Sequence, residues 1–171
     1  MARELRSDEA DVEPYDALSC THTSLRRAAR QFTQLYDDAL APAGLSSAQA
    51  LLVAQIDQLG GAPGGKGPSL QALSKRLAIQ ISALTHALRP LVRDGLVSLH
   101  TDAEDRRIKR AVLTEQGMSQ TRQMYVLWRE VNQRIEAVLG DGAAEQLRGL
   151  ANRVASPDFL AAFGQTTKSA D

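Results

Sequence analysis

The stretch Leu73–Val97, which reads LSKRLAIQISALTHALRPLVRDGLV, decides the fold of this chain. Ser69, a good N-cap residue, opens a short helix just before it, and Ala78–Gln80 form a turn before a second helix begins near Ile81. Each helix has a single apolar stripe, made first by Leu70, Leu73 and Leu77 and then by Leu84, Leu88 and Leu91. Two short helices joined by a tight turn predict a helix-turn-helix.

The residues after this pair predict a β-hairpin. Gly95 is a natural helix stop, and the two residues Val97 and Leu99 alternate with polar ones, as in a half-buried strand. A polar tip over Thr101–Arg106 precedes a second alternating run over Arg107–Leu113. A hairpin appended to a helix pair makes a winged helix-turn-helix.

Helices are expected on both sides of this module. A first helix over Tyr15–Leu40 ends before Pro42 and Gly44, and Ser46 or Ser47 caps a second. Thr114 caps a long helix of about 25 residues, roughly 37 Å, which a domain this small cannot bury on both faces.

Gly140–Gly142 end the long helix, and a last helix follows. Phe159, Leu160 and Phe163 in the tail are predicted to pack on another helix, because three exposed large apolar groups would be a liability. The predicted fold is mostly α with a small β wing (α+β). It comprises a flexible arm (1–14), a dimerisation helix (15–45), the winged helix-turn-helix (46–114), and C-terminal dimerisation helices with a tail (115–171).

The stretch Gly60–Pro68, GGAPGGKGP, contains the pattern G-x-x-x-x-G-K of a phosphate-binding loop. The preceding segment is helical rather than a strand, and Gly67 stands where Ser or Thr would hold magnesium. Pro63 and Pro68 also lack the N–H groups that an anion cradle needs. We interpret the stretch as a flexible helix-to-helix connection, with Lys66 far from the functional surface.

Composition predicts one soluble globular domain. The chain has 171 residues, of which 43% are hydrophobic and 23% charged, and nothing in it resembles a membrane span or a signal peptide. Its single cysteine, Cys20, excludes an internal disulfide and favours a cytoplasmic location.

The formal net charge of zero conceals a basic segment. Ser74–Arg110 contains eight lysines and arginines against four acids, a net charge of +4, so the remainder carries −4. A localised basic patch is typical of a protein that binds nucleic acid.

In this order and spacing, the sequence resembles the MarR family of bacterial transcription regulators over roughly residues 18–155. The resemblance depends on two segments, Leu73–Val97 and Asp102–Gly117. The second reads DAEDRRIKRAVLTEQG, and in it an acid is followed by paired arginines and then by the pattern Leu-Thr-x-x-Gly. The first-helix segment LRRAARQFTQLYDDALAPAGL is similar too. The resemblance implies a homodimer that binds a pseudo-palindromic operator in double-stranded DNA.

The second helix of such a pair presents its N-terminal residues to base edges in the major groove. The predicted recognition residues are Gln80, Ser82, Thr85, His86 and Arg89. His86 stands where the family commonly has arginine, and Thr85 with His86 could instead form an ordinary solvated face. Pro90 should kink this helix by removing the hydrogen bond to the carbonyl of His86.

The wing and the first helix of the pair supply the other predicted DNA contacts. Arg106 lies near the apex, where a narrow minor groove attracts a guanidinium, and Asp105 is expected to position an arginine. Arg107 and Lys109 are predicted to contact DNA from the wing. The predicted contacts to DNA phosphates are Ser69, Lys75 and Arg76. Arg110 either touches a phosphate or faces outward.

In this family small aromatic or phenolic acids commonly bind between the first helix, the second and the long helix. By resemblance, Arg26 or Arg30 would pair with a carboxylate, His22 would orient it, and Tyr36 and Trp128 would line the cavity. The alternative is that these arginines form surface or intersubunit salt bridges.

A hydroperoxide-sensing branch of the family has a reactive cysteine and a tyrosine fourteen residues later. Tyr36 matches that tyrosine, but the cysteine position is His22, and Cys20 lies two residues earlier on another side of the helix. Cys20 is therefore either a redox sensor or an idle thiol.

An enzyme is not expected, because the three histidines lie far apart and no nucleophile–base motif is present. No metal site or cofactor is expected either. A winged-helix module that binds protein instead of DNA remains the alternative.

Overall fold

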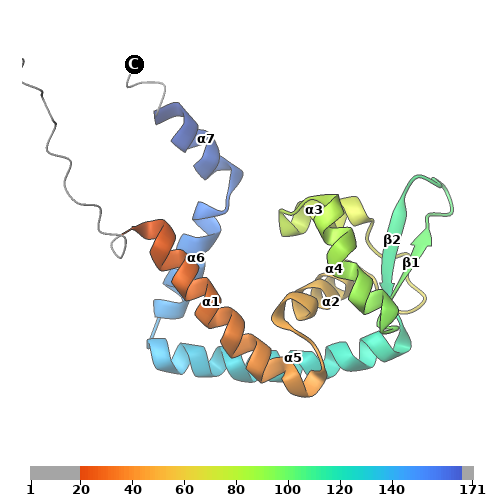
Figure 1. The fold of residues 1–171 in the computed structure, drawn as a ribbon, viewed down its shortest axis with the longest axis horizontal. Helices are drawn as coiled ribbons and strands as arrows, with labels where there is room; N and C mark the ends of the chain where they lie inside the picture. Colours follow the sequence, from red (N-terminus) through yellow and green to blue (C-terminus); the bar gives the residue numbers. More distant parts are fainter. Residues whose placement is uncertain (1–19, 167–171) are drawn as a thin grey trace, which may run out of the picture. The chain divides into compact units, whose positions relative to one another are not determined.

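The computed structural model describes residues 20–166, which divide into two compact units with the boundary between Leu35 and Tyr36 (Figure 1). Helix α1 (Thr21–Leu40) crosses the boundary between the units. The helix predicted from Tyr15 therefore begins at Thr21 within the described residues, since Cys20 is not helical. The predicted arm over residues 1–14 lies outside them.

A short 3-10 turn, η1 (Ala41–Ala43), leads through Gly44 into α2 (Ser47–Gln58). Ser46 is the N-cap: its side chain accepts a hydrogen bond from the backbone of Gln49, and the Gln49 side chain accepts one from Ser46. This capping box satisfies two amide groups at the helix start. The buried face of α2 supplies Val53 and Ile56 to the core.

The helix-turn-helix is formed by α3 (Leu70–Leu77) and α4 (Ile81–Arg93), as predicted. Ser69 caps α3 by accepting a hydrogen bond from Ala72, and the turn reverses at Ala78, which adopts a left-handed φ of 53°. The helix α4 is continuous through Pro90. Its three stripe leucines are fully buried, so the stripe anchors the recognition helix to the core.

The wing consists of β1 (Val97–Thr101) and β2 (Lys109–Leu113), which pair antiparallel with Leu99 opposite Ala111. The second strand was predicted to begin at Arg107, but it begins at Lys109. Arg107 belongs to the turn, because two hydrogen bonds to Asp105 close it. The side chain of Asp105 accepts from the backbone N–H of Arg107, and its carbonyl accepts from the backbone N–H of Ile108.

The long helix α5 (Glu115–Leu139) is capped by Thr114, whose side chain accepts a hydrogen bond from Gly117. Gly117 lies so close to Leu96, the residue before β1, that a Cβ atom at Gly117 would be 1.9 Å from the carbonyl oxygen of Leu96. Only glycine permits this approach between the start of α5 and the wing. The elements α2, α4 and β2 pack with α5 around one core.

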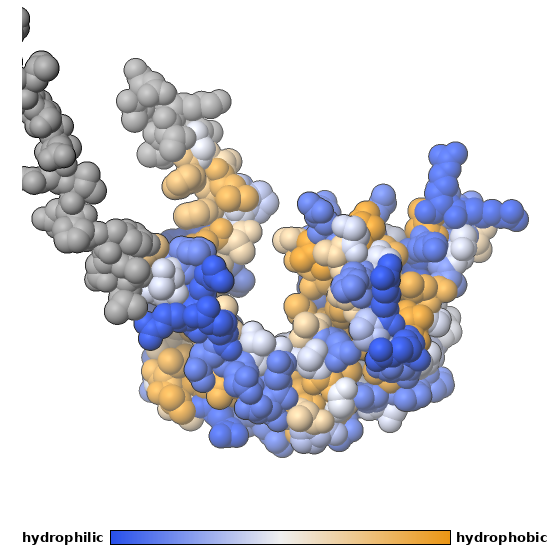
Figure 2. Space-filling model, in the orientation of Figure 1, coloured by the Kyte–Doolittle hydropathy of each residue, from blue (hydrophilic) through white to orange (hydrophobic). Residues whose placement is uncertain are grey.

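Two further helices follow α5, namely α6 (Ala143–Val154) and α7 (Pro157–Thr166). The tail was predicted to bury its apolar groups against another helix, but Leu160 is 68% and Phe163 65% exposed in the single chain. Figure 2 shows this surface as orange patches along α6 and α7. Within one chain α7 contacts α6 without covering these side chains, so their packing on another helix stays a prediction.

Within residues 20–166, no helix by itself is long and apolar enough to cross a membrane.

Candidate nucleic-acid interface

The N-terminal half of α4 presents polar side chains away from the buried leucines. Ser82, His86 and Arg89 are exposed, as is Gln80 at the N-cap position. Thr85 is half-buried and donates its hydroxyl hydrogen to the carbonyl of Ile81 at 2.8 Å. Thr85 therefore offers a ligand only its oxygen lone pairs and its methyl group.

The predicted phosphate contacts of α3 differ in their surroundings. Lys75 is exposed, whereas the guanidinium of Arg76 donates a hydrogen bond of 2.8 Å to the side chain of Gln55 on α2. Ser69 uses its hydroxyl oxygen to cap α3, which leaves its hydrogen for a second partner. Arg76 thus also ties the helix-turn-helix to α2.

The wing apex is shaped by hydrogen bonds from the backbone to Asp102. One carboxylate oxygen of Asp102 accepts from the N–H groups of Glu104 at 2.9 Å and Asp105 at 3.1 Å. These bonds close a tight turn that leaves Arg106 and Arg107 exposed at the apex. The wing tip is strongly hydrophilic (Figure 2).

The acid that holds an arginine in the wing is not the expected one. Asp102, not Asp105, forms the ion pair, and its partner is Arg110. The pKa of Asp102 lies well below its ordinary value, because its carboxylate accepts hydrogen bonds from Arg110 and from the two backbone N–H groups. Arg110 is therefore a structural residue of the wing rather than an outward-facing one.

Lys66 is also placed differently from the prediction. Its ammonium group lies 3.1 Å from a carboxylate oxygen of Glu104 and 3.5 Å from one of Asp102, so it touches the wing. The hydrogen bond that Lys66 donates to Glu104, together with the negative charge of Asp102, raises the pKa of Lys66. No local pattern signals this contact, since the paired residues are separated by 38 positions.

Four of the predicted DNA-binding residues surround one hollow. A cavity of about 580 Å³ lies between the starts of α3 and α4 and the wing. Its lining includes Ser69, Thr85, Arg107 and Lys109. The fold thus brings hydroxyl and cationic groups from three elements to one place, beside the carboxylate of Asp105.

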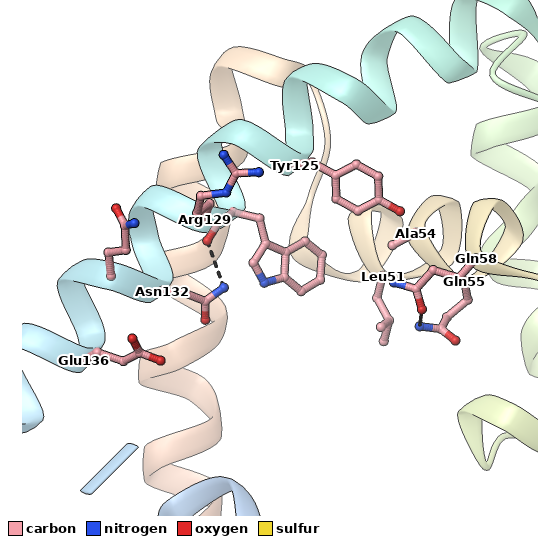
Figure 3. A pocket seen from close by; sticks show the side chains of 10 residues that line it. Leu51, Ala54, Gln55, Gln58, Tyr125, Arg129, Asn132 and Glu136 are labelled. Atoms are coloured by element: carbon pink, nitrogen blue, oxygen red, sulfur yellow. Dashed lines mark hydrogen bonds between the residues drawn. The ribbon is translucent and has the colours of Figure 1, made fainter. Parts of the chain in front are cut away.

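A second cavity, of about 770 Å³, opens between α2 and α5. Figure 3 shows its lining side chains, with Leu51 and Gln55 projecting from α2 and Tyr125 and Arg129 from α5. Trp128 lines it as well. The lining thus combines apolar surface with polar side chains, among them the guanidinium of Arg129 and the carboxylate of Glu136.

Aromatic and polar contacts give this cavity a rigid wall. Tyr36 packs edge-to-face on Trp128, with ring centroids 5.7 Å apart, and donates a hydrogen bond of 2.6 Å to Asn132. Tyr125 donates one of 2.9 Å to Asp57. Burial, together with this hydrogen bond and the charge of Asp57, raises the pKa of Tyr125 to about 12, so it is a neutral phenol at physiological pH.

The remaining residues predicted to bind an effector or to sense peroxide lie near the start of α1. His22, Arg26 and Arg30 are exposed on the first unit, and Cys20 is half-buried just before the helix. Their roles stay predictions. Arg129, Tyr125 and Gln55 were not anticipated, because only the packing of α2 on α5 brings them to one cavity.

Comparison with solved structures gives matches over most of the chain. The transcriptional regulator MosR of M. tuberculosis, in complex with DNA, is 32% identical, with 88% of this chain and 98% of that chain covered and a TM-score of 0.66. A mutant MarR from E. coli complexed with operator DNA is 21% identical, with coverages of 79% and 93% and a TM-score of 0.69. The chain belongs to the MarR family of transcriptional regulators.

Membership in the MarR family makes the chain a DNA-binding transcription regulator with a winged helix, and not an enzyme. A further MarR-like fold is that of BpsR from Bordetella bronchiseptica, solved to explain regulation of its DNA binding by 6-hydroxynicotinic acid. It is 19% identical, covers 84% of this chain and 99% of BpsR, and has a TM-score of 0.73. No family model matches the sequence, and no curated protein matches it.

Proposed function

We propose that this MarR-family chain acts as a homodimeric repressor that binds a pseudo-palindromic operator and is released by a small aromatic or phenolic acid. The observation that carries the proposal is the convergence of the exposed N-terminal face of α4 with the cationic wing around one hollow. The two recognition helices of a dimer would enter successive major grooves, about 34 Å apart. A cytoplasmic location is part of the proposal.

Each predicted contact has a distinct task in this proposal. Gln80 and Arg89 are suited to adenine and guanine edges, with Ser82, Thr85 and His86 completing the recognition face. Arg106 enters the minor groove beside the half-site. Phosphates are bound by Ser69, Lys75, Arg76, Arg107 and Lys109.

The effector part of the proposal is supported by the cavity between α2 and α5. Arg129 supplies a cation at its wall, and Trp128 supplies an aromatic surface backed by Tyr36. BpsR, whose DNA binding is regulated by an aromatic carboxylic acid, has a similar fold. The proposal keeps His22, Arg26 and Arg30 of α1 as predicted effector-binding residues.

DNA binding is tested with a labelled duplex taken from genomic fragments that the purified chain retains. Affinity should fall steeply as salt rises, and Arg106→Ala should weaken binding about tenfold. Arg93→Ala is the matched control, because Arg93 is exposed at the far end of α4 and paired with Asp94. Undiminished affinity of Arg106→Ala would refute the wing contact, and absence of duplex binding would favour a protein-interaction module.

Effector binding is tested by isothermal titration with a panel of aromatic acids that includes 6-hydroxynicotinic acid. Binding heat should be lost in Arg129→Gln and reduced in Arg26→Ala, but kept in Arg122→Gln, an exposed arginine on α5 outside the cavity. No heat from any acid would count against the effector class. Release of DNA by peroxide in wild type but not in Cys20→Ser would favour the redox alternative.

A further inference from the structure

The glycine-rich segment between α2 and α3 lies along the wing as an additional edge. The N–H of Leu113 donates to the carbonyl of Gly61 at 2.7 Å, and the N–H of Ala111 donates to that of Pro68 at 3.0 Å. Ser69 forms an isolated antiparallel bridge with Arg110. This connection is therefore held against β2 at both of its ends.

Glycine is required where the segment passes closest to β2. Gly67 has a φ of +68°, and a Cβ atom there would be 2.2 Å from the carbonyl oxygen of Ala111. The carbonyl of Gly67 accepts a hydrogen bond of 2.8 Å from the guanidinium of Arg110. Lys66, next to it, is thereby carried to a fixed place beside the wing.

The wing apex carries acids as well as cations. Residues 102–110 contain four cations and three acids, a net charge of +1. Arg110 pairs with Asp102 inside the wing, but Glu104 is exposed close to the surface proposed to meet DNA. An unpaired carboxylate there would repel phosphates, and Lys66 changes the local net charge from +1 to +2.

We propose that Lys66 is a positioning residue for DNA binding: it holds the carboxylate of Glu104 against the glycine-rich segment and neutralises it. The wing apex then presents Arg106 and Arg107 to DNA with one competing carboxylate fewer, while Asp105 remains exposed and accepts a hydrogen bond from the backbone of Arg107. The lysine of the apparent phosphate-loop pattern thus acts within the chain, through an acid of the wing. This inference rests on the wing meeting DNA, as proposed above.

A rival explanation is that Lys66 touches a DNA phosphate directly, since its side chain is 56% exposed. The two explanations differ in their dependence on Glu104. If Lys66 touches DNA directly, its substitution lowers the affinity whatever residue stands at position 104. If Lys66 acts through Glu104, its substitution has no effect once the Glu104 carboxylate has been removed. A double-mutant cycle separates them.

The experiment measures affinity of the full chain for the retained genomic duplex in wild type, Lys66→Met, Glu104→Gln and the double variant. Lys66→Met should weaken binding about threefold, but by less than about twofold in the Glu104→Gln background. Lys66→Arg should keep the wild-type affinity, because a guanidinium can still pair with Glu104.

Lys109→Met is the matched control, as a second exposed lysine of the wing, and should weaken binding equally with either residue at position 104. An equal loss on removing Lys66 in both backgrounds, or no loss at all, overturns the proposal. Thermal melting of each variant identifies any loss caused by unfolding. Failure of the wing contact itself would appear separately, as unchanged affinity in Arg106→Ala.

Discussion

The winged helix and the C-terminal helices differ in how far their apolar side chains are buried. On α4, the three stripe leucines are fully buried within one chain. On α6 and α7, Leu150 is 53% exposed, and Leu160 and Phe163 are more exposed still. Because monomeric proteins seldom leave contiguous apolar surface open, this difference supports the proposal that a second chain covers the C-terminal helices.

The two regions also differ in how charge is used. The wing combines a buried carboxylate, Asp102, with a half-buried guanidinium, Arg110, inside a network of hydrogen bonds. The ion pair between Arg148 of α6 and Glu136 of α5 is exposed on both sides. Electrostatics therefore shapes the wing, whereas exposed pairs of the second kind contribute little to stability.

The largest effect should come from the core of the winged helix. Leu88→Ala removes a fully buried side chain and should lower the free energy of unfolding by about 3 kcal/mol. The matched change Leu150→Ala on α6 should cost the isolated chain less than about 1 kcal/mol. Urea unfolding measured at low protein concentration checks both, and equal losses would remove the contrast between the regions.

Association should depend on the exposed residues of α7. Leu160→Ser combined with Phe163→Ser should weaken the dimer by about 2 kcal/mol, roughly thirtyfold, because two apolar groups no longer leave water. Sedimentation equilibrium measures the dissociation constant, with Val92→Ser on α4 as an exposed apolar control. A dimer of unchanged affinity would show that another surface joins the subunits.

A smaller loss of stability is expected for Asp102→Asn, and it should depend on pH. The pKa of Asp102 is lowered in the folded protein, so its stabilising contribution is fully present above the ordinary value of 3.8 and is lost as the pH falls toward the folded-state value. The difference between wild type and variant should therefore shrink below about pH 4. Urea midpoints at several pH values test this, and a constant difference would contradict it.

The smallest effect should be a gain of stability in the turn of the helix-turn-helix. Ala78 has a φ of 53°, which strains a residue that carries Cβ. Ala78→Gly should stabilise the chain by about 0.5 kcal/mol after the greater flexibility of glycine in the unfolded state is subtracted. Ala72→Gly within α3 should instead destabilise it by up to about 1 kcal/mol, and thermal melting distinguishes the two signs.

Much of the winged helix could be read from local patterns. Ser69 and Thr114 cap the helices predicted to start there, and the turn at Ala78–Gln80 separates α3 from α4 as expected. The apolar stripes identified buried leucines correctly, including Leu73 and Leu88. These features depend on residues three or four positions apart, whose relation the chain fixes by itself.

Local sequence patterns predicted less of the candidate site than of the fold. Charge and motif order placed the exposed face of α4 and the wing arginines, but they selected Asp105 where Asp102 binds Arg110. Both acids precede the arginines in sequence, and only the turn geometry decides which carboxylate points inward. The apolar tail was likewise recognised, but the surface that covers it stays a prediction.

By itself, the sequence determined the order of the helices, the hairpin and the cationic character of the middle of the chain, because periodicity, caps and charge act over a few residues. Only the tertiary structure decided that Lys66 meets Glu104, that Arg76 meets Gln55, and that Tyr125 faces a cavity beside Asp57. Such pairs form between segments that pack together for apolar reasons, and their polar partners are set by the resulting geometry.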